Sequence, residues 1–266
     1  PSNGQMQEEP RLLLQDFVND PYNYVGIMRA IAQGSRTQAT IASHVGLPKN
    51  HIPRYVKVLR ETGFVEREIP ITEANGKSRR GRHFITDAYL RFYYHFLSQF
   101  QSKLALGEQQ EVQQEIEANL PQFIQDNSWQ ELCREWVLRA SAHGQLDAPV
   151  QEVGSLWMRT HVFDVAGIDR ESKTLVLGNC FWNDAPADIG EFRELLNRTA
   201  HVIPEEGTWT VHYILFSASG WNRYAHEQAP ALLKKRAIDG ANWQPASVQL
   251  LDLERVDDDL VRWTSI

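Results

Sequence analysis

The chain has 266 residues, of which 42% are hydrophobic and 23% charged, values that are ordinary for a folded globular protein. Its net charge of −7 argues against a protein that is basic throughout. No run of about 18 apolar residues is present, which excludes a transmembrane helix, and the first residues lack the basic and apolar regions of a secretory signal. We therefore expect a cytoplasmic protein with no membrane partner.

The first predicted element is a helix over residues 21–33, where apolar side chains recur at helical spacing. A short helix over residues 37–44 follows, and Gly46 lies where the chain needs a left-handed residue to turn. A third helix is predicted over about residues 50–62, with Asn50 as N-cap and Pro53 in its first turn. This order is typical of a helix-turn-helix.

The third helix has two chemically different faces. Its apolar face is predicted to be buried and comprises Ile52, Tyr55, Val56 and Leu59. On the opposite side, His51, Arg54 and Lys57 recur every three residues. Because the third helix of a winged helix enters the DNA major groove, we predict that these three side chains contact DNA.

A hairpin is predicted after this helix, with strands over residues 64–69 and 83–85 joined by a loop over residues 72–82. The loop carries Lys77, Arg79, Arg80 and Arg82. Cations on a loop that contains glycine can adapt to phosphates, so these four residues are predicted to contact the DNA backbone. Residues 21–100 are therefore predicted to be a winged helix-turn-helix that binds double-stranded DNA. The alternatives are a protein-binding winged helix and a loop that is merely solvated.

Charge is distributed unevenly along the chain. Residues 37–83 contain nine Lys or Arg and four Glu, a net charge of +5, which leaves −12 for the rest. A basic segment within an acidic chain indicates a local surface for a polyanion.

The region between the hairpin and the next domain is helical in pattern. Residues 87–100 place aromatic side chains on one helical face, which favours core packing. Residues 108–120 form a polar, Glu- and Gln-rich helix, and Pro121 is predicted to end it. We therefore assign residues 101–127 to a helical connector.

Residues 128–266 are predicted to form an α/β domain. A helix over residues 128–140 precedes strands over residues 162–167 and 174–180, and a helix over residues 188–200 leads to a strand over residues 209–216. A further strand is expected at residues 247–252. This order fits a mixed sheet with helices on both faces, so the whole chain is an α+β or α/β protein. Cys133 and Cys180 lie in apolar runs and are expected to be buried free thiols.

The chain resembles the C-terminal region of a family of prokaryotic, archaeal-type ATPases. Those proteins carry an ATPase domain, then a winged helix, then a domain of unknown function related to the PD-(D/E)XK nuclease fold. The resemblance implies that residues 1–20 are the remnant of a linker to an ATPase domain. The matching stretches are GKSRRGR at 76–82, LRFYY at 90–94, NLPQF at 119–123, ELCRE at 131–135, VGSLW at 153–157, FDVA at 163–166, LGNCFW at 177–182 and LFSASG at 215–220.

The nuclease motif departs from the family pattern. In that fold, a strand-end Asp and a Glu-x-Lys on the next strand hold a divalent metal and activate water. Asp164 is retained and Glu131 could supply a helix carboxylate, but Asn179 stands at the Glu position and Phe181 at the Lys position. Asn binds Mg²⁺ more weakly than a carboxylate does, and Phe cannot carry charge. The resemblance thus predicts a vestigial site at these four positions, with no catalytic residue, bound metal or cofactor.

Three functions remain open at this point. The leading hypothesis is a non-enzymatic, DNA-binding regulatory region of an ATPase-type protein. The second is an active DNA nuclease that uses Mg²⁺ with an altered ligand set built on Glu131 and Asp164. The third is a protein-interaction module of a larger assembly, with an ATPase domain or a second copy of the chain as its partner.

Overall fold

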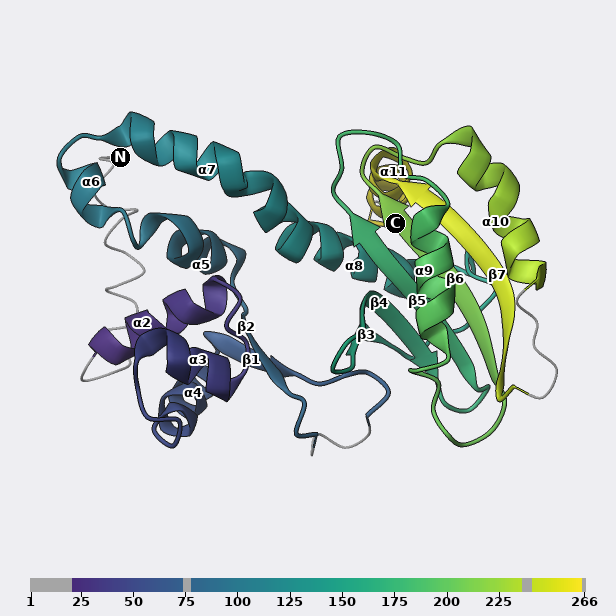
Figure 1. Ribbon diagram of the computed structural model, residues 1–266, viewed down its shortest axis with the longest axis horizontal. Coiled ribbons are helices and arrows are strands. Elements are labelled where there is room, and N and C mark those ends of the chain that lie inside the picture. The colour runs from purple at the N-terminus through teal and green to yellow at the C-terminus, as the bar shows by residue number, and fades with distance from the viewer. Residues whose placement is uncertain (1–20, 74–77, 236–240, 265–266) are drawn as a thin grey trace. The chain divides into compact units, whose positions relative to one another are not determined.

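The computed structural model describes residues 21–73, 78–235 and 241–264 (Figure 1). The chain divides into two compact units. The first comprises residues 1–69 and 79–120, and the second comprises residues 70–78 and 121–266. Residues 70–78, which lie between the two strands of the predicted hairpin, therefore belong to the second unit. Within the described residues, no helix is long and apolar enough to cross a membrane.

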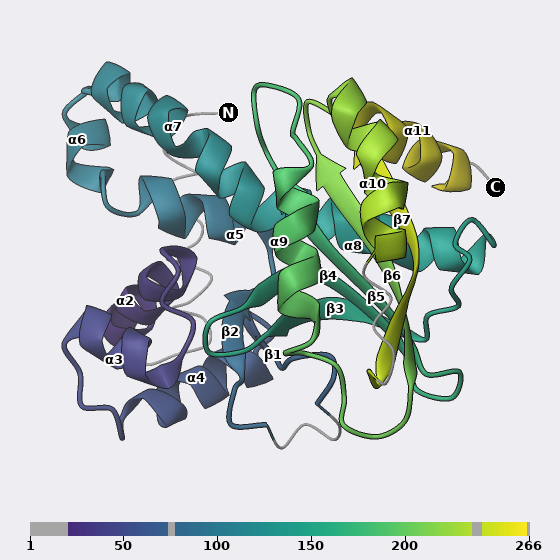
Figure 2. The same cartoon turned by 45° about the vertical axis from the view of Figure 1, so that its right-hand side comes forward.

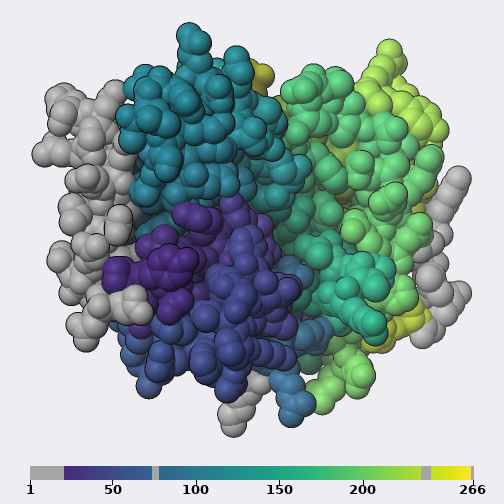
Figure 3. All heavy atoms as spheres, turned by 60° about the vertical axis from the view of Figure 1, so that its left-hand side comes forward, coloured from purple at the N-terminus to yellow at the C-terminus, as the bar shows by residue number. Residues whose placement is uncertain are grey.

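The first unit begins with three helices, α2 (Pro21–Ala32), α3 (Gln38–Val45) and α4 (Ile52–Glu61). Helix α3 starts with a capping box, in which the side chains of Thr37 and Thr40 satisfy each other's backbone N–H groups. It ends at Gly46, whose φ of 69° is the predicted left-handed turn. The side chains of α2, α3 and α4 form one continuous surface in the space-filling view (Figure 3).

The predicted buried face of α4 is confirmed, because Ile52, Tyr55, Val56 and Leu59 are all buried. The predicted N-cap is wrong. His51 occupies that position and makes no side-chain cap, and its N–H donates to the Pro48 carbonyl at 2.9 Å in a preceding turn. Strands β1 (Val65–Glu68) and β2 (Arg82–Ile85) pair antiparallel and complete the winged helix.

The rest of the first unit is helical. The aromatic segment forms α5 (Ala88–Phe92) and a π-helical turn, η1 (Tyr93–Leu97), and α6 (Gln101–Ala105) follows. The predicted end at Pro121 is wrong, because α7 (Gln109–Ile124) continues through it into the π-helical turn η2 (Gln125–Trp129) and α8 (Gln130–Ala142). Residues 109–142 are thus helical without interruption.

The second unit contains a mixed sheet of five strands in the order β3-β4-β5-β6-β7 (Figure 2). Strands β3, β4 and β5 pair antiparallel, whereas β5, β6 and β7 are parallel. The parallel strands are joined through helices α9 and α10, as parallel pairing requires a crossover. The bounds are β3 (Glu152–Trp157), β4 (Val162–Asp169), β5 (Thr174–Phe181), α9 (Gly190–Thr199), β6 (Trp209–Ser217), α10 (Arg223–Lys235), β7 (Trp243–Asp252) and α11 (Leu253–Thr264).

Successive side chains of β4 and β5 point to opposite faces of the sheet and pack in two separate hydrophobic cores. Ala166 and Leu177 join Phe192 of α9 and Ala225 of α10 on one face, whereas the adjacent residues Val165 and Val176 pack with α8 and α11 on the other. This alternation places helices on both faces of the sheet, as predicted. Cys133 and Cys180 are both buried free thiols, which confirms that expectation.

Candidate nucleic-acid interface

The predicted DNA-contacting residues of α4 share an exposed face. His51, Arg54 and Lys57 are all exposed, and Arg60 lies one turn further along the same helix and is also exposed. The burial of the opposite face against α2 and the hairpin fixes this orientation. The result is a row of basic side chains on a rigid helix, the geometry that a major-groove reader needs.

Two of these side chains already have protein contacts. The guanidinium of Arg54 lies 4.9 Å from the centroid of the Tyr55 ring and donates to the Tyr55 hydroxyl at 3.1 Å. Lys57 pairs with Glu61 at 3.7 Å, and both side chains are more than half exposed. An exposed pair of this kind contributes only about 0.3–0.5 kcal/mol, so a phosphate can replace Glu61 at little cost.

The four cations of the loop lie in different environments. Arg79 and Arg80 are exposed, whereas Lys77 lies outside the described residues. Arg82 is part of β2, where it is opposite Glu68 in the strand register. Burial lowers the pKa of the Arg82 guanidinium, and Glu68 acts in the opposite direction. Arg79 and Arg80 are therefore better placed for phosphate contact than Arg82.

The first residues of the loop belong to the second unit. Ile71 is buried in the core beneath α9 and α10, its N–H donates to the Ser155 carbonyl at 3.1 Å, and its carbonyl accepts from Arg170 at 2.8 Å. Arg170 also pairs with Glu152 on β3. Because β3 is an edge strand, Ile71 satisfies part of an otherwise unpaired edge.

In the second unit, Asp164 is held by protein hydrogen bonds. Its carboxylate accepts from the Cys180 N–H at 3.1 Å and from Gln130 Nε2 at 3.2 Å. Arg134 donates to the Asp164 carbonyl at 2.8 Å. Burial raises the pKa of the Asp164 carboxyl group, while the Cys180 N–H and the Arg134 cation act to lower it.

The other three positions that the resemblance singles out do not complete a metal site. The Asn179 amide, oriented by its partners, donates to the Gly178 carbonyl at 2.9 Å and accepts from Arg198 at 3.3 Å. Phe181 packs edge-on against Trp221, with ring centroids 6.2 Å apart. Glu131 is exposed on α8. These groups do not fit a hard divalent cation, which requires several convergent oxygen ligands. Within the described ranges, no cluster of three or more His, Cys, Asp or Glu residues could hold a metal.

Sequence reasoning missed the polar residues that surround Asp164. Gln130, rather than its neighbour Glu131, reaches the carboxylate, and Arg134 lies one turn further along α8. Gln125 in η2 binds the backbone at the end of β5, since it donates to the Cys180 carbonyl at 2.7 Å and accepts from the N–H of Trp182, the residue after the strand. The spacing of Gln130 and Arg134, one helical turn apart, was the available signal.

Comparison with known proteins identifies two segments of the chain. Residues 93–195 match DUF234, described as archaea bacterial proteins of unknown function, and residues 24–68 match the IclR helix-turn-helix domain. A protein of Methanocaldococcus jannaschii, described only as uncharacterized, is 26% identical over 179 residues. That alignment covers 67% of this chain and 40% of the relative, so the chain spans two-fifths of the relative's length.

Two solved structures show a limited likeness to the chain. MepR from S. aureus, in complex with DNA, is 20% identical and has a TM-score of 0.26, with 46% of this chain and 88% of that one covered. A MarR-family regulator from Neisseria meningitidis is 23% identical and has a TM-score of 0.25, with 45% and 89% covered. The two family matches show that the chain contains a helix-turn-helix domain followed by a DUF234 segment.

Proposed function

We propose that this chain is the double-stranded DNA-binding, regulatory region of a longer ATPase-type protein. The observation that carries the proposal is the exposed basic row His51, Arg54 and Lys57 on α4, together with the exposed Arg79 and Arg80 of the loop. These side chains lie in a segment of net charge +5 within a chain of net charge −7. Local positive charge on an acidic protein favours one polyanion-binding face.

The two groups of cations have different roles in this proposal. Residues on α4 read base edges in the major groove, while Arg79 and Arg80 contact phosphates beside it. Lys77 and Arg82 are proposed as further phosphate contacts. Phosphate contacts supply most of the affinity and its salt dependence, because each one releases condensed counterions.

The second unit is proposed to be a nuclease-like scaffold that makes contacts without cutting DNA. Its one retained acid, Asp164, is occupied by hydrogen bonds from Cys180 and Gln130. Asn179 and Phe181 bring neither a carboxylate nor a cation to the site. The resemblance to archaeal-type ATPases further suggests an ATPase domain before residues 1–20, and the alignment with only 40% of the M. jannaschii relative leaves room for one.

The proposed organisation has a winged helix at residues 21–100, a helical connector at residues 101–127 and the nuclease-like domain at residues 128–266. A partner ATPase domain or a second copy of the chain would contact the nuclease-like domain. A chain that self-associates but has no affinity for duplex DNA would favour the protein-interaction hypothesis instead.

DNA binding is tested by fluorescence anisotropy with a labelled duplex over a salt series from about 50 to 200 mM. Affinity is expected to fall steeply with salt. The double variant Arg79→Ala/Arg80→Ala is expected to bind less tightly at every salt concentration. Its salt slope is expected to be smaller by about 1 for each phosphate that the missing arginines no longer neutralise.

The matched control is Arg159→Ala/Arg193→Ala, which removes the same charge from two arginines of the second unit. It is expected to bind DNA like the unsubstituted protein. Salt-independent binding, or equally weakened binding by both double variants, would contradict the proposal.

The nuclease hypothesis is tested by incubating DNA with the protein and Mg²⁺ or Mn²⁺. We expect no cleavage that depends on Asp164. Cleavage that is abolished by Asp164→Ala, and by the isosteric Asp164→Asn, would overturn the view of the second unit as an inactive scaffold.

A further inference from the structure

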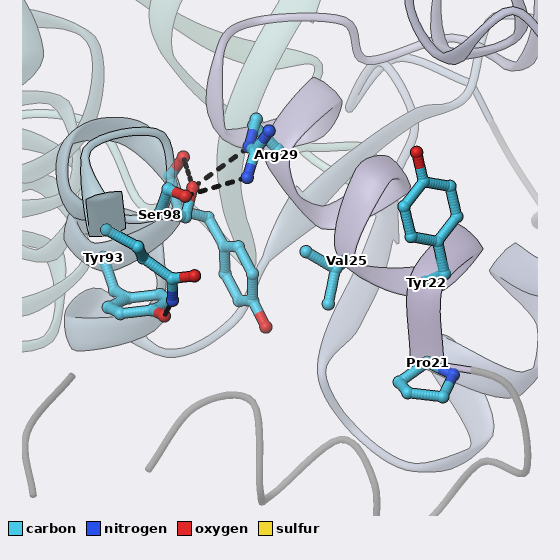
Figure 4. Close-up of a pocket in the computed structure, with 8 residues that line it drawn as sticks. Pro21, Tyr22, Val25, Arg29, Tyr93 and Ser98 are labelled. Carbon is cyan, nitrogen blue, oxygen red and sulfur yellow. Dashed lines mark hydrogen bonds between the residues drawn. The ribbon is translucent and has the colours of Figure 1, made fainter. Parts of the chain in front are cut away.

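A hollow of about 320 Å³ lies between α2 and the π-helical turn η1 in the first unit (Figure 4). Tyr93 and Tyr94 beside it are only 2% and 1% exposed. Arg29 at its wall donates to the Ser98 hydroxyl at 3.1 Å and to the Ser98 carbonyl at 2.9 Å. These rings are closed to a ligand and the guanidinium is bound within the protein, so the hollow does not define a ligand.

An unpaired surface lies instead at one edge of the sheet in the second unit. Strand β7 is the last of the five strands and is ten residues long (Figures 1 and 2). Within the described residues, the backbone of residues 244–250 makes hydrogen bonds only to β6, and the Leu251 carbonyl accepts from Trp221 Nε1 at 3.1 Å. The outer N–H and C=O groups of an edge strand are a template for a further strand.

The opposite edge of the sheet is protected. Strand β3 has only six residues and contains a register shift. The Ile71 N–H already occupies the Ser155 carbonyl, and Glu152 pairs with Arg170. Short or irregular strands and charged side chains are the usual means by which proteins block a sheet edge.

Strand β7 lacks this protection over its second half. No residue from 243 to 251 is charged. Pro245 and the register shift beside it interrupt only the start of the strand, whereas residues 247–252 pair with β6 in an unbroken register. A long, regular and uncharged edge strand favours pairing with another strand.

The sequence of this stretch is complementary to itself in antiparallel orientation. Val248 and Leu250 pack on the sheet face covered by α9 and α10, whereas Leu251 packs on the other face. A twofold axis perpendicular to the sheet at Gln249 places residues with the same side-chain direction opposite each other. Val248 then faces Leu250 of the second copy. Ser247 faces Leu251 of the second copy, and the two Gln249 side chains face each other.

We propose that β7 pairs antiparallel with the β7 of a second copy of this chain, about a twofold axis at Gln249. The paired stretch sets no like charges opposite each other, since Asp252 faces Ala246 of the second copy. Because β3 is protected, pairing stops at a dimer and does not continue into a fibre. The interface is small, so the dimer is expected to dissociate on dilution. This inference concerns the second unit alone and does not depend on DNA binding.

The test is sedimentation velocity of the full chain at low salt, over a concentration series from about 1 to 100 µM. The sedimentation coefficient is expected to rise with concentration from that of a monomer toward that of a dimer. Gln249→Lys places two cations opposite each other at the axis and is expected to weaken dimerisation about tenfold or more. Gln249→Glu places two anions there and is expected to have a similar effect.

A mixture of the two variants tests the register directly. It sets Lys opposite Glu, so it is expected to dimerise more tightly than either variant alone. The control is Gln244→Lys, which adds the same charge at an exposed position of β7 before the paired stretch. It is expected to dimerise like the unsubstituted protein. Circular dichroism confirms that each variant is folded.

A monomer at every concentration overturns the proposal and leaves the β7 edge for a strand of another protein. The proposal is also overturned if Gln249→Lys and Gln244→Lys weaken the dimer equally, or if the mixture dimerises no better than its components. DNA affinity is measured separately. A dimer without DNA affinity contradicts only the proposed DNA binding, and a DNA-binding monomer contradicts only the pairing of β7.

Discussion

His83 is a buried ionisable side chain on the wing strand β2. It is only 3% exposed, and its Nδ1 has no hydrogen-bond partner among the described residues. Burial lowers the pKa of His83 to about 4, and the nearby cations Arg60 and Arg67 act in the same direction. The imidazole is therefore neutral in the folded protein at neutral pH.

This histidine predicts a pH dependence of stability. The unfolded chain binds a proton at His83 below pH about 6.5, whereas the folded chain binds it only below about 4. Stability is therefore expected to be complete above pH 6.5, and to fall by up to about 3 kcal/mol as the pH decreases to 4. Urea unfolding of the first unit, followed by circular dichroism, measures the loss.

The matched variant for this measurement is His83→Gln, which cannot titrate. Its stability is expected to depend less on pH between 4 and 6.5 than that of the unsubstituted protein. The same pH dependence in both proteins would show that other groups are responsible.

Individual site residues could be predicted only where a simple pattern determines exposure. The basic face of α4 follows from helical periodicity, because the positions of the four apolar residues determine where His51, Arg54 and Lys57 lie. The environment of Arg82 could not be predicted, because it depends on the strand register that places it opposite Glu68. Likewise, only the packing of α8 against β4 shows that Gln130, and not Glu131, reaches Asp164.

At the scale of elements, the contact between β5 and β6 depends on one glycine. A Cβ atom at Gly178 would lie 2.2 Å from the Ile214 carbonyl oxygen, which is backbone in the adjacent parallel strand. No side-chain rearrangement can relieve that overlap. This close approach gives a physical reason for glycine in the LGNCFW stretch.

Gly178→Ala is therefore expected to destabilise the second unit by about 3 kcal/mol or more, the upper end of overpacking costs. The control is Gly154→Ala, whose Cβ would meet only the Ile71 side chain at an ordinary 3.8 Å. Urea unfolding measures both variants through tryptophan fluorescence, because all eight tryptophans lie at residue 129 or beyond. Equal stability of the two variants would contradict this account.

Elements with a clear period were predicted well, and the others were not. Helix α9 and strands β4, β5 and β6 lie close to their predicted ranges. Strand β3 was missed because it is short and irregular, with a register shift between Gly154 and Leu156. Helix α11 was not predicted as an element, because its three consecutive aspartates, residues 257–259, suit either a solvated turn or the start of a helix. One of them, Asp259, is buried, paired with Arg255 and Arg262, and hydrogen-bonded to Trp136.

At the scale of the whole molecule, the wing loop is shared between the two units. The strands β1 and β2 belong to the first unit, but Ile71 between them is buried in the second. Sequence patterns could not reveal this division, because the loop residues contact positions more than 80 residues away in the chain.

Ile71→Ala is expected to lower the free energy of unfolding of the second unit by about 2–4 kcal/mol, since it removes a buried side chain from that core. Tryptophan fluorescence in urea measures the change. Val162→Ala, at a residue that is 39% exposed, provides the control and is expected to cost much less. If the two substitutions lower the free energy of unfolding equally, the burial of Ile71 does not stabilise the second unit as described.

The shared loop also has a consequence for how the chain is made. Ile71 is synthesised 84 residues before Ser155, its backbone partner. At about 5–20 residues per second, that interval lasts on the order of ten seconds. During this time, a nascent winged helix carries an exposed isoleucine in its loop. The loop therefore cannot be anchored until the downstream sheet has been translated.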